Sequence, residues 1–92
     1  MRRIHRSDHN ADELVKAARR LGMLVNLIGR PTDALIGIRG TWYAVELKSA
    51  AGTYTPAQRS FLRDCQAHHL PVLTWRTVND VIACANGVVE ER

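Results

Sequence analysis

The sequence predicts a single small α/β domain, residues 1–92, in which helices flank a mixed sheet and the elements run α-β-β-β-α-β-α. Three observations lead to this fold class. The 92 residues suffice for one hydrophobic core and leave no room for a second domain. The 46% hydrophobic and 24% charged residues are typical of a globular chain. Apolar residues recur with helical spacing in some segments and form short β-like runs in others.

The first two elements follow from apolar periodicity and from glycine breaks. A helix is predicted over Asn10–Leu21 and should end at Gly22, because apolar residues repeat at helical spacing on one side: Leu14, Ala17, Ala18 and Leu21. Met23–Ile28 is an apolar run between Gly22 and Gly29. It is too short for a helix, so a strand is predicted.

Two further β-like runs, Ala34–Ile38 and Trp42–Lys48, lie close enough in the chain to form a hairpin. If the turn is centred between Arg39 and Gly40, paired positions sum to 79 and Asp33 opposes Glu46. This register also gives one continuous apolar face, made of Ala34, Ile36, Ile38, Tyr43, Val45 and Leu47. A loop of three or five residues would change the pairing.

A loop, Ala50–Tyr54, precedes the clearest helix start in the chain. Thr55 is the expected N-cap, Pro56 stands at the first helical position, and Gln58 completes a capping box. The buried side of this helix is expected to consist of Phe61, Leu62 and Cys65.

The last strand is predicted over Pro71–Trp75, and Thr77 should cap a final helix that ends at Asn86-Gly87. The inward side of that helix is expected to hold Val78, Val81, Ile82 and Ala85.

Composition and charge narrow the functional classes. No apolar run reaches the length of a membrane span, and no apolar segment follows the basic start of the chain, so a cytoplasmic protein without a secretory signal is expected. Cys65 and Cys84 form no CxxC pair, which predicts reduced, half-buried thiols and no zinc site. His5 and His9 share helical spacing but are interpreted as solvated. The net charge of +4 makes a polyanion a plausible partner without requiring one.

The predicted hairpin gathers three charged side chains. Strand alternation puts Glu46 and Lys48 on the same face, and the register brings Asp33 opposite Glu46. Two facing carboxylates repel unless a cation lies between them, and Mg²⁺ takes one or two carboxylates while keeping waters for a substrate phosphate. The triplet therefore suits phosphodiester hydrolysis. The alternative is a solvated strand face, since E-x-K triplets are common.

These residues resemble the PD-(D/E)xK nuclease superfamily, and within it the VRR-NUC and Holliday-junction-resolvase-like nucleases common in phages. The resemblance runs from Asp8 to Ala83 and rests on the element order, on Asp33 in Pro31-Thr32-Asp33, on Glu46-Leu47-Lys48, on Glu13 and on Thr55-x-x-Gln58. The sequence departs from the family's usual Gly-x-Pro-Asp because Thr32 separates Pro31 from Asp33.

The resemblance implies a restriction-endonuclease-like core and a Mg²⁺- or Mn²⁺-dependent DNA endonuclease, selective for branched or junction DNA and active as a homodimer in a bacterial cell or phage-infected host. Asp33 and Glu46 would bind the metal together with the Leu47 carbonyl, Lys48 would position the attacking water, and Glu13 would support the metal or the water. Gln58 would lie at the edge of the site.

Simpler roles stay open for several of these residues. The alternative for Glu13 is a role in an N-terminal cap with Asn10 and none at the site. The alternative for Gln58 is its capping box alone. Trp42 and Tyr54 could stack on a base, or pack in the core or in a dimer contact. The candidate nucleic-acid contacts are Arg2, Arg3, Arg6, Lys16, Arg30 and Tyr54, and the candidate exposed dimer contacts are Trp75, Val88 and Val89.

Two other functions are compatible with the sequence. A non-catalytic DNA-binding module would keep the nuclease fold and the basic surface without cutting. A small subunit of a larger phage or bacterial nuclease would work only with its partner. RNA stays open as an alternative substrate.

Overall fold

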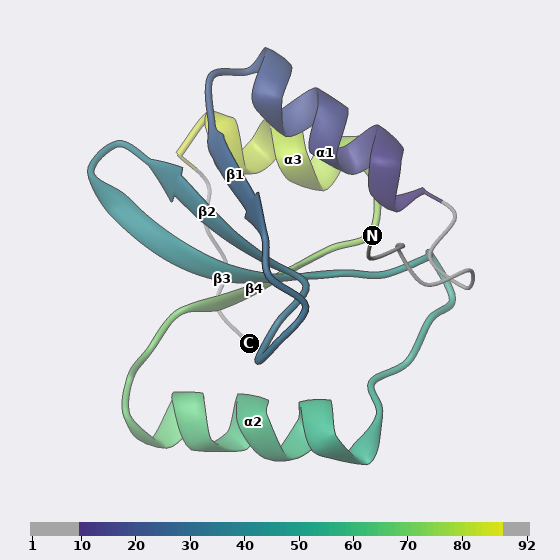
Figure 1. Ribbon diagram of the computed structural model, residues 1–92, viewed down its shortest axis with the longest axis vertical. Helices are drawn as coiled ribbons and strands as arrows, with labels where there is room; N and C mark the ends of the chain where they lie inside the picture. The colour runs from purple at the N-terminus through teal and green to yellow at the C-terminus, as the bar shows by residue number, and fades with distance from the viewer. Residues whose placement is uncertain (1–9, 88–92) are drawn as a thin grey trace.

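The computed structural model describes residues 10–87, and within this range the elements follow one another in the predicted order (Figure 1). Every boundary predicted from the sequence lies within one residue of the observed one. The elements are α1 (Ala11–Arg20), β1 (Leu24–Leu27), β2 (Ala34–Ile38), β3 (Thr41–Leu47), α2 (Pro56–Ala67), β4 (Val72–Trp75) and α3 (Val78–Ala85).

The four strands form one mixed sheet in the order β1-β2-β3-β4. The first two pairings are antiparallel and β3–β4 is parallel, so the chain needs the long crossover that contains α2. Figure 1 shows α1 and α3 together on one face of the sheet and α2 on the other. The result is a three-layer α/β domain in which the two faces of β3 meet different helices.

The β2–β3 hairpin has the predicted register. Ala34 pairs with Val45 and Ile38 with Thr41, so the turn consists of Arg39 and Gly40 alone. Both turn residues have positive φ, 49° and 77°, as a type I′ turn requires. Arg39 tolerates this strained conformation while its guanidinium donates hydrogen bonds to the carbonyls of Cys84 and Ala85, at 2.9 and 2.8 Å. The hairpin tip is thereby tied to the end of α3.

The hydrophobic core lies between the sheet and the α1/α3 layer. The apolar hairpin face predicted from the sequence points into it: Ala34, Ile36, Val45 and Leu47 are buried, and Ile38 and Tyr43 are partly buried. Leu14 and Ala18 of α1 and Val81 of α3 cover this face. No helix within residues 10–87 is long and apolar enough to cross a membrane.

Several predicted exposures are wrong. Trp75, expected to be an exposed dimer contact, is only 2% exposed, because it pairs with Leu47 in the parallel register and shares its core-facing side. Ile82, expected inside, is 41% exposed, and the buried residues of α3 are Val81 and Cys84. Leu21 is exposed because it is the C-cap of α1 and lies beyond the helical stripe.

The burial of α2 also differs from the prediction. Of the three residues expected inside, Cys65 is buried, whereas Phe61 and Leu62 are only partly buried. Cys65 and Cys84, expected to be half-buried, are both buried free thiols. The other candidate dimer contacts, Val88 and Val89, lie outside the described residues, as do His5 and His9.

Candidate active site

Asp33 immediately precedes β2 and reaches across to the backbone of β3. Its Oδ2 accepts a hydrogen bond from the Leu47 N–H at 2.8 Å. Its own carbonyl accepts the N–H groups of Ile28 and Gly29, at 3.0 and 3.3 Å, which closes the β1–β2 loop. The strand ladder ends at Ala34, so the predicted pairing of Asp33 with Glu46 is not part of it, and the Asp33 side chain instead contacts the backbone of Leu47. The Asp33 carboxylate is thus bound at Leu47, the residue between Glu46 and Lys48 in the sequence.

Thr32, the residue that departs from the expected loop pattern, has a place of its own in the structure. Its side chain is buried, and its Oγ1 donates a hydrogen bond to the Ala34 carbonyl at 3.0 Å. The inserted position is therefore turned inward beside the start of β2, and Asp33 keeps its place at the end of the strand.

Glu46 lies on the face of β3 opposite the core and is only 1% exposed. Gln58 of α2 contacts it: the Gln58 Nε2 donates to the Glu46 Oε1 at 3.4 Å, a long and weak hydrogen bond. The same Gln58 side chain accepts the Thr55 N–H at 2.9 Å and so completes the predicted capping box. The Gln58 side chain therefore caps α2 and contacts Glu46 at the same time. The capping role and a position beside Glu46 are compatible.

Lys48 follows the last residue of β3 and lies on the same side as Glu46 by strand alternation. Its side chain is only 8% exposed, and its Nζ lies 5.8 Å from the centroid of the Tyr54 ring, within cation–π range. The Lys48 N–H donates to the Trp75 carbonyl at 3.0 Å, which extends the β3–β4 pairing by one residue. Asp33, Glu46 and Lys48 thus belong to the same strand end, where Asp33 binds the backbone of the residue between the other two. Their joint role at a metal stays a prediction.

Two residues at this strand end are missing from the sequence-based site. The Asn10 Nδ2 donates to the carbonyls of both Lys48 and Arg76, at 3.2 and 2.7 Å. Arg76 follows β4, and its Nη1 donates to the carbonyls of Ser49 and Gly52, at 2.9 and 2.7 Å. Asn10 has only the signal of a helix N-cap, yet its side chain makes no capping bond, and Arg76 has no local signal at all.

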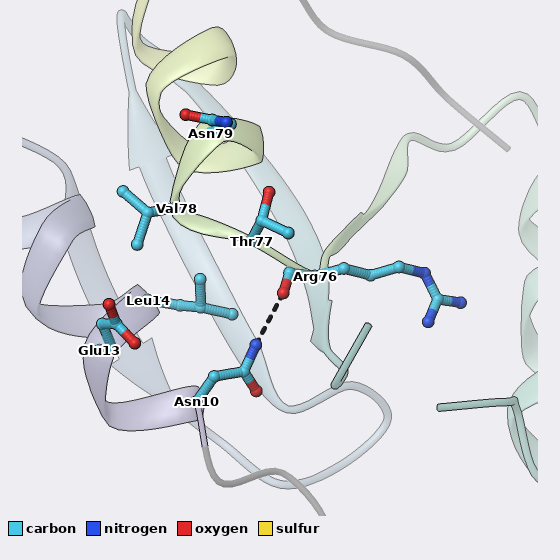
Figure 2. Close-up of a pocket in the computed structure, with 7 residues that line it drawn as sticks. All are labelled: Asn10, Glu13, Leu14, Arg76, Thr77, Val78 and Asn79. Atoms are coloured by element: carbon cyan, nitrogen blue, oxygen red, sulfur yellow. Dashed lines mark hydrogen bonds between the residues drawn. The ribbon is translucent and has the colours of Figure 1, made fainter. Parts of the chain in front are cut away.

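Glu13 shares a pocket with Asn10 and Arg76, the two residues just placed at the strand end. It is exposed on α1 and lines a surface pocket of about 330 Å³, together with Asn10, Leu14, Arg76, Thr77, Val78 and Asn79 (Figure 2). Asp33, Glu46 and Lys48 do not line this pocket. In Figure 2 the Arg76 guanidinium extends away from Glu13. A role for Glu13 at the metal or the water stays a prediction.

The candidate nucleic-acid contacts are only partly within the described range. Lys16 on α1 and Arg30 in the β1–β2 loop are exposed, whereas Arg2, Arg3 and Arg6 lie outside the described residues. Tyr54 is partly buried, and its hydroxyl is hydrogen-bonded to the Thr74 Oγ1. Trp42 is 53% exposed and so does not belong to the core.

The donor set at the strand end suits a hard divalent cation. Asp33 and Glu46 supply carboxylate oxygens, and the Leu47 carbonyl belongs to the residue between Glu46 and Lys48. Residues 10–87 contain no group of three or more His, Cys, Asp or Glu side chains that could hold a metal. Mg²⁺ and Mn²⁺ need fewer protein ligands, since Mg²⁺ usually takes one or two carboxylates and completes its shell with water and substrate phosphate.

Compared with protein-family models, with curated proteins and with solved structures, the chain gives no match. The resemblance to PD-(D/E)xK nucleases therefore rests on the residues of this chain and on their arrangement.

Proposed function

We propose that this protein is a divalent-metal-dependent DNA endonuclease of the PD-(D/E)xK type, which hydrolyses phosphodiester bonds. The observation that carries the proposal is the 2.8 Å hydrogen bond from the Leu47 N–H to the Asp33 carboxylate, because it fixes that carboxylate beside the Glu46-Leu47-Lys48 triplet. A merely solvated strand face would leave Glu46 and Lys48 exposed, whereas both side chains are buried.

In this mechanism Asp33, Glu46 and the Leu47 carbonyl would hold Mg²⁺ or Mn²⁺. When bound, the cation polarises a phosphoryl oxygen and lowers the pKa of a bound water. Lys48 orients the attacking water and offsets the negative charge that builds on the phosphoryl oxygens. Gln58 contacts the Glu46 carboxylate through the long hydrogen bond from its Nε2. The water oxygen forms a bond to phosphorus, one P–O ester bond breaks, and the products are a phosphate monoester and an alcohol.

The substrate and the assembly belong to the same proposal. A net charge of +4 and the exposed Lys16 and Arg30 suit a phosphate backbone. The resemblance favours branched or junction DNA and a homodimer, since two symmetry-related sites match a two-fold junction. A monomer at high micromolar concentration in light scattering would overturn the dimer and leave the chemistry untouched.

The test is cleavage of labelled four-way junction, flap, nicked and linear duplex DNA in Mg²⁺, Mn²⁺ or EDTA. We expect metal-dependent cutting that falls at least about 100-fold in Glu46→Gln and Lys48→Ala, since each removes a charged group from the transition state. Asp64→Asn, which removes an exposed carboxylate from α2, is the matched control and should cut normally. A folded wild type that cuts none of these substrates, or a folded Glu46→Gln that cuts at the wild-type rate, would overturn the proposal.

One observation favours a non-catalytic DNA-binding module as the second candidate. The hydrogen bond from a backbone N–H to the Asp33 carboxylate ends the β2–β3 ladder, and this structural role alone accounts for an aspartate at this position. Such a module would bind DNA in a salt-sensitive way, with the same affinity in EDTA and in Asp33→Asn. An endonuclease would bind DNA more tightly with the metal, and Asp33→Asn would lose that gain.

A further inference from the structure

The loop that follows β3 folds back over the side chain of Lys48. A Cβ placed on Gly52 would lie 3.5 Å from the Lys48 Cδ and 3.0 Å from the Ser49 Oγ, so the Gly52 backbone lies against the lysine stem. This contact is part of the reason that Lys48 is so little exposed. The position of the Lys48 ammonium therefore depends on what holds the loop in place.

Arg76 holds that loop. Its Nη1 donates to the carbonyls of Ser49 and Gly52, and a third, longer contact of 3.5 Å reaches the Ala50 carbonyl. Because Arg76 directly follows β4, the guanidinium ties the loop after β3 to the neighbouring parallel strand. Lys lacks the planar fork of Arg and binds as a compact point charge, so it is a poor replacement for a guanidinium in such a contact.

Tyr54, at the far end of the loop, connects the same two residues. The Lys48 Nζ lies 5.8 Å and the Arg76 Cζ 6.0 Å from the centroid of its ring. The hydroxyl of Tyr54 is hydrogen-bonded to the Thr74 Oγ1 on β4, which anchors the ring at its outer end. The ring is thus a fixed surface against which the lysine ammonium rests.

Asn10 fixes the two strand ends relative to each other. One side-chain amide donates to the carbonyls of Lys48 and Arg76, and Figure 2 shows the bond to Arg76. Neither residue can shift along its strand without breaking a bond to this amide. Loop, ring and amide therefore meet at Lys48, and Arg76 is in contact with all three.

We propose that Arg76 is a positioning residue that sets the Lys48 ammonium over the Tyr54 ring by holding loop residues 49–52 against the lysine stem. The inference rests on the proposed function, in which Lys48 orients the attacking water, and adds a residue to which that function assigns no role. Arg76 acts through Lys48. A displacement of about 1 Å at a catalytic group is enough to cost about 100-fold in rate.

The first test is an NMR measurement and does not depend on enzyme activity. The chain has only two lysines, Lys16 and Lys48, so their signals are easily told apart. In protein labelled with ¹³C-lysine, the ε-methylene signal of Lys48 should be shifted by the Tyr54 ring relative to that of exposed Lys16, which is the internal control. Arg76→Ala should move the Lys48 signal to the position of the Lys16 signal. Arg63→Ala, which removes an exposed charge from α2, should leave it in place.

Gly52→Ala tests the same contact with Arg76 intact and covers the case in which Arg76→Ala fails to fold. The added methyl crowds Ser49 and the lysine stem, so the Lys48 signal should move in the same direction by a smaller amount. A Lys48 signal that stays at its wild-type position in folded Arg76→Ala, or in Gly52→Ala if Arg76→Ala does not fold, would overturn the proposal.

The second test separates positioning from substrate binding. In the cleavage assay, Arg76→Ala should lower kcat about 100-fold with KM changed less than twofold, and added guanidinium ion should restore part of the rate. Arg76→Lys should remain slow. Loss of kcat without any rescue, together with an unmoved Lys48 signal, would show that Arg76 has another role. If the wild type does not cut at all but the signal shifts as expected, the nuclease proposal fails while the positioning of Lys48 stands.

Discussion

At the scale of single residues, Asp33 combines a structural contact with its proposed metal-binding role, and the two separate by mutation. Asp33→Ala removes the acceptor of the Leu47 N–H and should lower the free energy of unfolding by about 1 to 3 kcal/mol. Asp33→Asn keeps an acceptor and should lose less. Urea unfolding at pH 7 measures both. Equal losses in the two variants would mean that the hydrogen bond contributes little to stability.

Divalent cation provides a second measurement on the same residue. Mg²⁺ at ten times its Kd should raise the unfolding free energy of the wild type by about 1.4 kcal/mol, and EDTA should remove the gain. Neither Asp33 variant should respond, because each lacks one of the two carboxylates. If Mg²⁺ stabilises Asp33→Asn as strongly as the wild type, the cation binds elsewhere.

The two buried thiols predict how stability depends on alkaline pH. Burial, and to a smaller extent the neighbouring Asp64, raises the pKa of Cys65; burial also raises the pKa of Cys84, partly opposed by Arg39. The unfolded chain therefore loses thiol protons first, so the unfolding free energy should fall as the pH rises above about 8.5. Urea unfolding under reducing conditions should show a smaller fall in the variant with Cys65→Ala and Cys84→Ala. An unchanged slope would contradict this assignment.

At the scale of elements, the start of α2 links helix capping to the site. Gln58→Ala should lower the unfolding free energy by about 1 kcal/mol, because it removes the acceptor of the Thr55 N–H. Gln58→Glu keeps that acceptor but replaces the donor to Glu46 by a carboxylate. It should be destabilised at pH 7 and recover when the pH falls far enough to protonate a carboxylate, whereas Gln58→Ala should not recover. Parallel urea titrations at both pH values decide the matter.

Elements whose signals are local can be predicted from the sequence, and contacts between distant segments cannot. The hairpin register follows from a two-residue turn and an alternating apolar face, so the sequence alone predicts that Asp33 lies close to Glu46. Asn10 and Arg76 lie 66 residues apart and meet only because β4 pairs in parallel with β3. No local pattern encodes that pairing. The prediction for Trp75 is wrong for the same reason, since a four-residue strand does not reveal which face meets the core.

At the scale of the whole molecule, the layer arrangement gives the two faces of the sheet different tasks. The face toward α1 and α3 holds the core, while the face toward α2 carries Glu46, Lys48 and the Gln58 contact. Because alternate residues of β3 point to opposite faces, the residue number alone tells which face a side chain lies on. Odd positions such as Val45 stabilise the core, and even positions such as Glu46 line the candidate site.

The last prediction concerns DNA binding and follows from the net positive charge of the molecule. If Lys16 and Arg30 contact phosphates, each alanine substitution should weaken binding about equally for all sequences and reduce the slope of log K against log salt by about one. Both side chains are exposed, so neither substitution should alter the fold. Fluorescence anisotropy with labelled duplex and junction DNA, from about 50 to 200 mM salt, measures the slopes, with Asp12→Asn on α1 as a control. A slope that is unchanged in both variants would mean that DNA does not contact Lys16 on α1 or Arg30 in the β1–β2 loop. A slope reduced in Arg30→Ala alone would confine it to the sheet end that carries Asp33, because Arg30 and Asp33 share that loop.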